Sequence, residues 1–532
     1  MSLQFIIGSS GSGKSCYAYQ NIIEQAGLHP EKLFFVIVPE QFTMQTQKTL
    51  VEMSPGKGIL NIDILSFERL AYRVLEEVGG DSRTLLEETG KSMVLQKMVQ
   101  QHGKELSYLG GQMRKAGYLD EVKSILSEFM QYDIRDSEIQ EMIEDSSDRA
   151  LLQMKLKDVS VLYQAFTGYL KDHYMTGEEV MDALEKALPF SRKMKNSVLL
   201  LDGYTGFTPI QMRVVGELLA VCEKVMVTVT MDAAENLSTR GKPYQLFYMS
   251  RQMIHRLSEL TREIEEPVLL KDVKKSRFSQ APALHFLEKN IFRYRKNVYK
   301  KKQDEICMFS ATSPLKEMEE TARRIARLIR EKDCRYGEIA VITGNLEEYG
   351  NLAKQVFAAA GIPYFIDEKH TVLMNPFVEY FRAALEMAVQ DFSYESVFRY
   401  LRCGMSCVTR EEADLLENYV LALGIRGFKK WDEVWVRIYR GMPPENIQRL
   451  NEIRERFADE TRELALSFKG GKKTVREYCT ILYEFALKSQ VQQKLKHQEL
   501  KFKEQGDKAM EKEYAQIYGI VMELLDNMVE IL

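Results

Sequence analysis

Residues 3–15 read LQFIIGSSGSGKS, which is an apolar run, a loop of glycines and serines, and then a lysine and a serine. The composition of residues 3–7 predicts a buried strand, and the apolar spacing of residues 15–26 predicts a helix. The loop between them matches the pattern G-x-x-x-x-G-K-[ST] in full. The order strand, glycine-rich loop, helix predicts a phosphate-binding loop (P-loop). Its glycines let backbone N–H groups turn toward phosphate oxygens, and the helix N-terminus adds a positive dipole end.

This P-loop is the predicted nucleotide site. We expect Lys14 to reach the β- and γ-phosphates of ATP and the Ser15 hydroxyl to bind the accompanying Mg²⁺. The alternative is a glycine-rich turn that binds no ligand. The residues predicted to contact ATP are Gly8, Ser9, Ser10, Gly11, Ser12, Gly13, Lys14 and Ser15.

The groups that hydrolysis requires are incomplete in the sequence. P-loop ATPases hold Mg²⁺ with an acidic residue at a strand end, and a neighbouring carboxylate usually activates water. In SVLLLDGYTGF (197–207), Asp202 is a degenerate Walker B candidate and a second predicted Mg²⁺ ligand, but Gly203 stands where a catalytic glutamate is usual. The later apolar run AVITGN (340–345) also lacks the arginine that a helicase-like chain would offer there. We therefore assign no catalytic residue and expect slow turnover or none. A plain turn at the end of a strand is the alternative role for Asp202.

The composition is that of a globular protein. Of 532 residues, 45% are hydrophobic and 28% are charged, which excludes intrinsic disorder and collagen. Lys and Arg number 73 against 77 Asp and Glu, so any signal for nucleic acid must be local. Seven cysteines without paired spacing are typical of a reduced, cytoplasmic protein, and no apolar run is long enough to predict a membrane span.

Two α/β blocks, each interrupted or followed by helices, are predicted along the chain. Strands that alternate with helices indicate parallel sheets, so the expected fold class is α/β. The expected organisation is 1–78 (first part of the P-loop domain), 79–190 (helical insertion), 191–304 (rest of that domain and a basic linker), 305–375 (start of a second α/β domain) and 376–532 (second helical insertion). The last predicted helix stops in mid-pattern at NMVEIL, which predicts a longer natural chain.

The strands of the first block are predicted at 3–7, 33–38, 59–65, 197–201 and 224–230. In the second block, ICMFSAT (306–312) and EIAVITGN (338–345) are predicted strands on either side of a helix at 315–331.

A basic segment lies between residues 271 and 304. It carries eleven basic and three acidic residues, a local charge of +8 in a chain whose net charge is −4. Interleaved aromatic residues suit phosphate contacts beside base stacking. Arg293, Arg295 and Lys296 are therefore DNA-binding candidates, and a solvated linker between two domains is the alternative.

Several stretches resemble a known family. They are GSSGSGKS (8–15), VIVPEQFTMQTQ (36–47), NIDILSFERLAYRVL (61–75), LLLDGYTGFTPIQ (199–211), GIPYFIDEKHTVLMNPFVEYFRAAL (361–385) and ENYVLALGIRGFKKWDEVW (417–435). Together they resemble the N-terminal half of the AddB family, the non-motor subunits of bacterial AddAB helicase–nucleases.

The resemblance implies two RecA-like P-loop domains with large helical insertions, as in superfamily-one helicases, with several motor motifs degenerate. It implies an AddA-type helicase subunit as partner, single- and double-stranded DNA as substrates, and a role in double-strand break repair that includes recognition of Chi. The family's nuclease, with its [4Fe-4S] cluster, would lie in a C-terminal region that this chain does not contain. The PEQFT and LSFERL segments would line the single strand, which adds Gln41, Thr43, Ser66 and Phe67 as DNA-binding candidates.

Three other functions remain open. An autonomous ATPase or helicase stimulated by single-stranded DNA is the main alternative, and Gly203 argues against it. A small-molecule P-loop kinase would not need a second α/β block. A scaffold without nucleotide would leave the complete P-loop unexplained.

Overall fold

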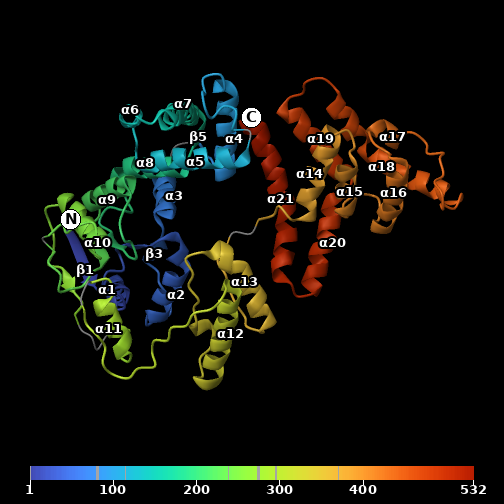
Figure 1. The fold of residues 1–532 in the computed structure, drawn as a ribbon. Helices are drawn as coiled ribbons and strands as arrows, with labels where there is room; N and C mark the ends of the chain where they lie inside the picture. The colour runs from blue at the N-terminus through green and yellow to red at the C-terminus, as the bar shows by residue number, and fades with distance from the viewer. Residues whose placement is uncertain are drawn as a thin grey trace. The chain divides into compact units, whose positions relative to one another are not determined.

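The computed structural model describes residues 2–79, 83–113, 115–237, 239–271, 276–293, 296–368 and 371–532. The chain forms two units, Met1–Met308 and Phe309–Leu532, and each has its own hydrophobic core (Figure 1).

A six-stranded parallel sheet forms the centre of the first unit. The strand order is β3-β2-β6-β7-β1-β8, and because all the strands are parallel, their carboxyl ends share one edge. The strands are β1 (Ser2–Gly8), β2 (Phe34–Ile37), β3 (Ile62–Leu65), β6 (Val198–Leu201), β7 (Lys224–Thr230) and β8 (Val268–Leu269). The predicted α/β class and the five predicted strands of this block are confirmed, whereas β8 was not predicted.

Both faces of the sheet are covered by helices, which explains why its strands are continuous apolar runs. Ile6 and Leu200 pack with α1 and α2 on one face, whereas Ile7 and Leu201 face α3, α8, α9 and α10 on the other. The helices that follow these strands are α1 (Lys14–Leu28), η1 (Glu40–Phe42), α2 (Thr43–Met53), α3 (Phe67–Val78), α9 (Pro209–Val221), α10 (Tyr248–Glu259) and α11 (Pro282–Asn290).

Helices occupy most of the chain between β3 and β6. A short parallel pair, β4 (Thr84–Leu85) with β5 (Tyr174–Met175), joins the two ends of this segment. Its helices are α4 (Glu88–His102), α5 (Ala116–Gln131), α6 (Asp136–Asp145), α7 (Ala150–His173), α8 (Gly177–Ala187) and η2 (Leu188–Phe190).

The second unit begins with a helix pair and departs from the prediction. The predicted helix at 315–331 is confirmed as α12 (Pro314–Glu331), which packs on α13 (Leu346–Ala359). The predicted strands at 306–312 and 338–345 are wrong: in the described part of the second unit no residue belongs to a strand, and 336–338 form a 3₁₀ turn, η4 (Tyr336–Glu338). An apolar run becomes a strand only when a neighbouring strand pairs with it, and here none does.

Residues after 375 are mainly helical. Their core is aromatic, with Tyr380, Tyr400, Trp431 and Phe457 fully buried. The helices are α14 (Pro376–Val389), α15 (Tyr394–Arg402), α16 (Arg410–Leu423), α17 (Phe428–Asp432), α18 (Asn446–Lys469), α19 (Val475–Lys488), α20 (Val491–Glu504) and α21 (Lys508–Ile531). Among the described residues, no helix is both long enough and apolar enough to cross a bilayer.

Candidate nucleotide-binding site

The P-loop joins β1 to α1 at the carboxyl edge of the sheet. Gly11 and Gly13 have positive φ angles of 72° and 91°, a conformation that costs other residues about 1–2 kcal/mol. A Cβ on Gly8 would lie 2.2 Å from the Ser12 hydroxyl oxygen, so a side chain there would displace that hydroxyl. That Ser12 oxygen is buried and has no hydrogen-bond partner among the described residues. A shielded, unsatisfied oxygen inside a glycine-built loop fits a site shaped for a ligand.

Lys14 folds over the loop that precedes it. Its Nζ donates a hydrogen bond to the Ser9 carbonyl oxygen at 3.0 Å. Burial lowers the pKa of the Lys14 amine, and the nearby carboxylates of Asp202 and Glu288 oppose this shift. A lysine that burial makes harder to charge gains most when an anion such as a phosphate lies beside it.

Asp202 directly follows β6 and lies next to the P-loop serine. The Ser15 hydroxyl donates to Asp202 Oδ1 at 3.1 Å, and the Thr228 hydroxyl donates to the same oxygen at 2.6 Å. The Tyr19 hydroxyl donates to Oδ2 at 2.6 Å. Asp202 is only 5% exposed, so these hydrogen bonds replace most of its hydration.

Sequence reasoning did not identify Tyr19 and Thr228. Tyr19 lies one helical turn after Ser15 on the buried face of α1, and Thr228 lies in β7 beside the end of β6. Burial and the Asp202 carboxylate raise the pKa of the Tyr19 hydroxyl, which therefore stays a proton donor. The i, i+4 spacing from Ser15 was a usable signal for Tyr19, but the position of Thr228 depends on strand register.

The pair Ser15 and Asp202 fits a magnesium–nucleotide complex. Mg²⁺ prefers oxygen ligands, usually one or two protein oxygens together with phosphate oxygens and water. A hydroxyl and a carboxylate in contact at the P-loop offer this donor set, with Tyr19 and Thr228 orienting the carboxylate. When bound, the ion would neutralise phosphate charge beside Lys14.

Gly203 follows Asp202 with a φ of 84°. Its amide nitrogen is 3.4 Å from the Thr228 hydroxyl, and a Cβ at this position would lie 3.5 Å from Pro39 Cδ. The position where a catalytic glutamate is usual therefore has a backbone conformation that disfavours a side chain.

Three of the four DNA-binding candidates in the PEQFT and LSFERL segments are buried. Thr43, Ser66 and Phe67 are each about 5% exposed. Ser66 caps α3, and the Phe67 ring packs edge-on against Tyr204 at 5.4 Å between centroids. Only Gln41, in η1, is exposed. Thr43, Ser66 and Phe67 thus support the carboxyl edge of the sheet, and Gln41 lies on its surface.

The candidates of the basic segment also differ from one another. The Arg293 side chain is 7% exposed and forms ion pairs with Asp232 and with Glu288, the latter at 3.3 Å. Its guanidinium is already neutralised, which argues against a phosphate contact. Lys296 is exposed, and Arg295 lies outside the described residues.

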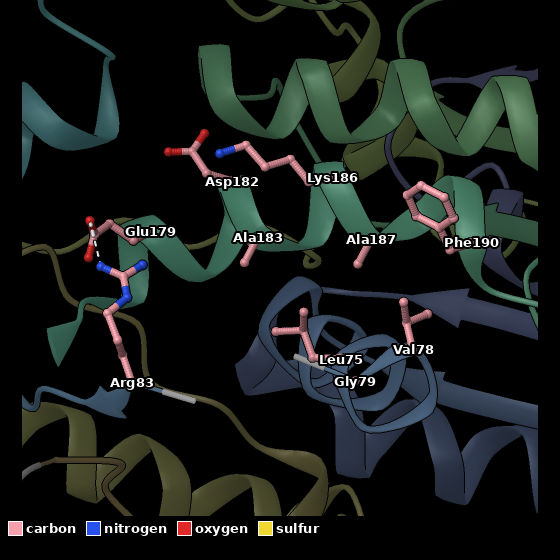
Figure 2. A pocket seen from close by; sticks show the side chains of 10 residues that line it. All are labelled: Leu75, Val78, Gly79, Arg83, Glu179, Asp182, Ala183, Lys186, Ala187 and Phe190. Carbon is pink, nitrogen blue, oxygen red and sulfur yellow. Dashed lines mark ion pairs between the residues drawn. The ribbon is translucent and has the colours of Figure 1, made fainter. Parts of the chain in front are cut away.

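A separate cavity of about 370 Å³ lies between α3 and α8, away from every predicted site residue. Figure 2 shows Arg83 and Glu179, paired at 3.7 Å, on the opposite side of the view from Phe190. The other residues that line this cavity are Leu75, Val78, Gly79, Asp182, Ala183, Lys186 and Ala187.

The seven cysteines are all free thiols. Burial raises the pKa of the Cys403 thiol to about 12, so this thiol is a poor metal ligand. A search of the described residues finds no group of three or more His, Cys, Asp or Glu side chains placed to hold a metal ion.

Comparison with known proteins identifies the family of the chain. The family model described as "ADDB, N-terminal" matches residues 5–288. Three relatives are named as ATP-dependent helicase/deoxyribonuclease subunits of the B type: that of Lachnoclostridium phytofermentans is 41% identical, that of Caldanaerobacter subterraneus 34% and that of Clostridium novyi 33%. Each match includes the whole of this chain and 46–47% of the relative, so the chain spans about half the length of these proteins. Since the family model covers more than half of the sequence, the chain belongs to the AddB family.

Proposed function

We propose that this chain is the ATP-binding and DNA-binding part of a helicase–nuclease complex that prepares double-strand breaks for homologous recombination. The observation that carries the proposal is the complete P-loop with Ser15 hydrogen-bonded to Asp202. The named activity of the relatives supports the wider role. An AddA-type helicase subunit would be the partner, and recognition of Chi on the single strand would be part of this chain's contribution.

Nucleotide would be bound but turned over slowly or not at all. Asp202 can help to hold Mg²⁺, but Gly203 offers no carboxylate that could activate water. Motor activity would then come from the partner subunit, and ATP here would be structural or regulatory.

DNA would pass over the carboxyl edge of the sheet near η1. Gln41, Phe42 and Met44 are exposed there, and unpaired bases stack on exposed aromatic and apolar side chains. An ion pair of 2.8 Å between Arg69 and Glu40 links this surface to α3. Lys296 is the second candidate contact, through phosphate.

The second unit would be part of a second RecA-like domain. A cavity of about 1180 Å³ lies beside α12 and α13. It is lined by Phe309 and residues 339–345, from the two segments that lack strand pairing, and by residues 362–367. Ile342 and Phe365, which line it, are 93% and 88% exposed. Extended segments alternating with helices are the parts of a parallel sheet. We propose that further strands, from the half of the relatives' length that this chain does not match, fill the cavity.

The test of the nucleotide proposal is ATP binding and turnover by this chain, with and without single-stranded DNA, against Lys14→Ala. We expect binding that requires Lys14, with negligible turnover. DNA-stimulated turnover abolished by Lys14→Ala would instead establish the alternative, an autonomous ATPase. Equal nucleotide binding by both proteins would refute the proposed site.

A further inference from the structure

The start of the basic segment lies at the P-loop because of sheet register. β8 pairs in parallel with β1, and Leu269 lies opposite Ile7, one residue before the P-loop begins. The Leu270 amide donates to the Ile7 carbonyl oxygen at 2.8 Å. Its Cβ lies 3.2 Å from the position that a Cβ on Gly8 would take. The chain that leaves β8 therefore starts beside the chain that leaves β1.

A second contact forms at the apex of the P-loop. The Arg277 amide donates to the Gly11 carbonyl oxygen at 2.8 Å. The Phe278 ring approaches to 2.9 Å of the position that a Cβ on Gly11 would take, and Arg277 Cβ to 3.3 Å. Residues 276–278 thus hold the loop from outside and place the Arg277 side chain next to it.

Two arginines of the basic segment, Arg277 and Arg293, differ in whether carboxylates neutralise their charge. The Arg293 side chain is buried between Asp232 and Glu288. Arg277 is exposed, and no ion pair is found for it within the part of the chain that the structure describes. An exposed arginine whose amide and Cβ contact the P-loop is within reach of an anion bound there, and guanidinium groups bind phosphate oxygens with charged, bidentate hydrogen bonds.

We propose that Arg277 is a phosphate-binding residue of the nucleotide site, supplied by the first unit itself, and that residues 276–278 clamp the P-loop instead of contacting DNA. The proposal rests on the proposed nucleotide binding. The guanidinium would add to Lys14 on the outer phosphates, which makes the site selective for triphosphate over diphosphate.

The test measures the Kd values of ATP and ADP by calorimetry for Arg277→Gln, with Lys301→Gln, at an exposed lysine of the same segment, as the matched control. Losing charged hydrogen bonds should weaken ATP binding about tenfold and ADP binding less. Arg277→Lys should recover only part of the lost ATP affinity, because it keeps the charge but not the bidentate hydrogen bonds. Lys301→Gln should leave both constants unchanged, and single-strand affinity should be unaffected by Arg277→Gln.

Two failures can be told apart. If the unmodified protein binds ATP in a Lys14-dependent way and Arg277→Gln binds it equally well, the role of Arg277 is refuted and the nucleotide site stands. If Lys14→Ala does not change ATP binding, both proposals fail. A thermal melt of each variant checks folding. Because the Arg277 side chain is exposed, Arg277→Gln should leave the melting temperature unchanged.

Discussion

At the scale of single residues, the site is defined by what surrounds one carboxylate. Asp202 receives hydrogen bonds from Ser15, Tyr19 and Thr228, which fixes its orientation toward the P-loop. The next residue, Gly203, has a left-handed backbone. The residues proposed to bind Mg²⁺ therefore lie together, whereas Gly203 supplies no carboxylate of the kind that would activate water.

Replacing Gly203 with glutamate should not restore ATP turnover. Forcing a side chain into a φ of 84° should cost about 1–2 kcal/mol of unfolding free energy. Urea denaturation and a turnover assay measure the two effects. The matched control is Gly216→Ala in α9, where the new Cβ would make only ordinary contacts at 3.8 Å and stability should not fall. Turnover that rises in Gly203→Glu would contradict this account.

ATP affinity should decrease at alkaline pH through Lys14. Burial lowers the pKa of this amine in the free protein, whereas a bound phosphate stabilises the ammonium form and raises that pKa. Affinity should thus be full below the lowered pKa of the free protein and fall as pH rises through it. Titrating the Kd of ATP from pH 7 upward checks this, and Lys14→Met should lack that component. A pH-independent Kd would exclude the mechanism.

At the scale of elements, residues close in sequence have separate tasks. Ser66 caps α3 by accepting a hydrogen bond from the Arg69 amide, and the buried Phe67 ring anchors the same helix. Gln41 lies in η1 at the end of the neighbouring strand and is exposed. Motif resemblance groups these residues together, but burial separates support from surface.

Ser66→Ala should cost about 1 kcal/mol of stability, as loss of an N-cap does. Gln41→Ala should leave stability within about 0.5 kcal/mol and weaken binding to single-stranded DNA. Urea denaturation and fluorescence anisotropy with a labelled oligonucleotide separate the two effects, and each variant serves as control for the other. Unchanged DNA affinity in Gln41→Ala would remove η1 from the proposed DNA path.

At the scale of the whole molecule, the two units differ in whether their extended segments pair into a sheet. The first unit closes its sheet with helices on both faces. The second keeps α12 and α13 packed on each other, but residues 339–343 and 362–367 have no strand partner and line an open apolar cavity.

Ile342→Asp should not destabilise this chain, because the side chain is 93% exposed. In a polypeptide of the relatives' full length, where strands are proposed to fill the cavity, the same substitution should cost about 2 kcal/mol or more. Val436→Asp, at another apolar and exposed position of the second unit, is the control and should be neutral in both chains. Equal urea midpoints for Ile342→Asp and its parent in the longer polypeptide would rule out the proposed filling.

The sequence by itself determined the P-loop and the strands of the first sheet. Eight contiguous residues make the loop, and a sheet covered on both faces leaves long apolar runs that can be read locally. It also placed a glycine, Gly203, where a catalytic glutamate is usual in P-loop ATPases.

Only the tertiary structure decided which distant residues act together. The positions of Thr228 beside Asp202 and of Arg277 beside Gly11 depend on parallel strand register, and the neutralisation of Arg293 depends on carboxylates from two other segments. The strand predictions at 306–312 and 338–345 were wrong because strand formation also depends on distant neighbours. Their apolar composition is local, but hydrogen-bond pairing is a property of neighbours that no local pattern contains.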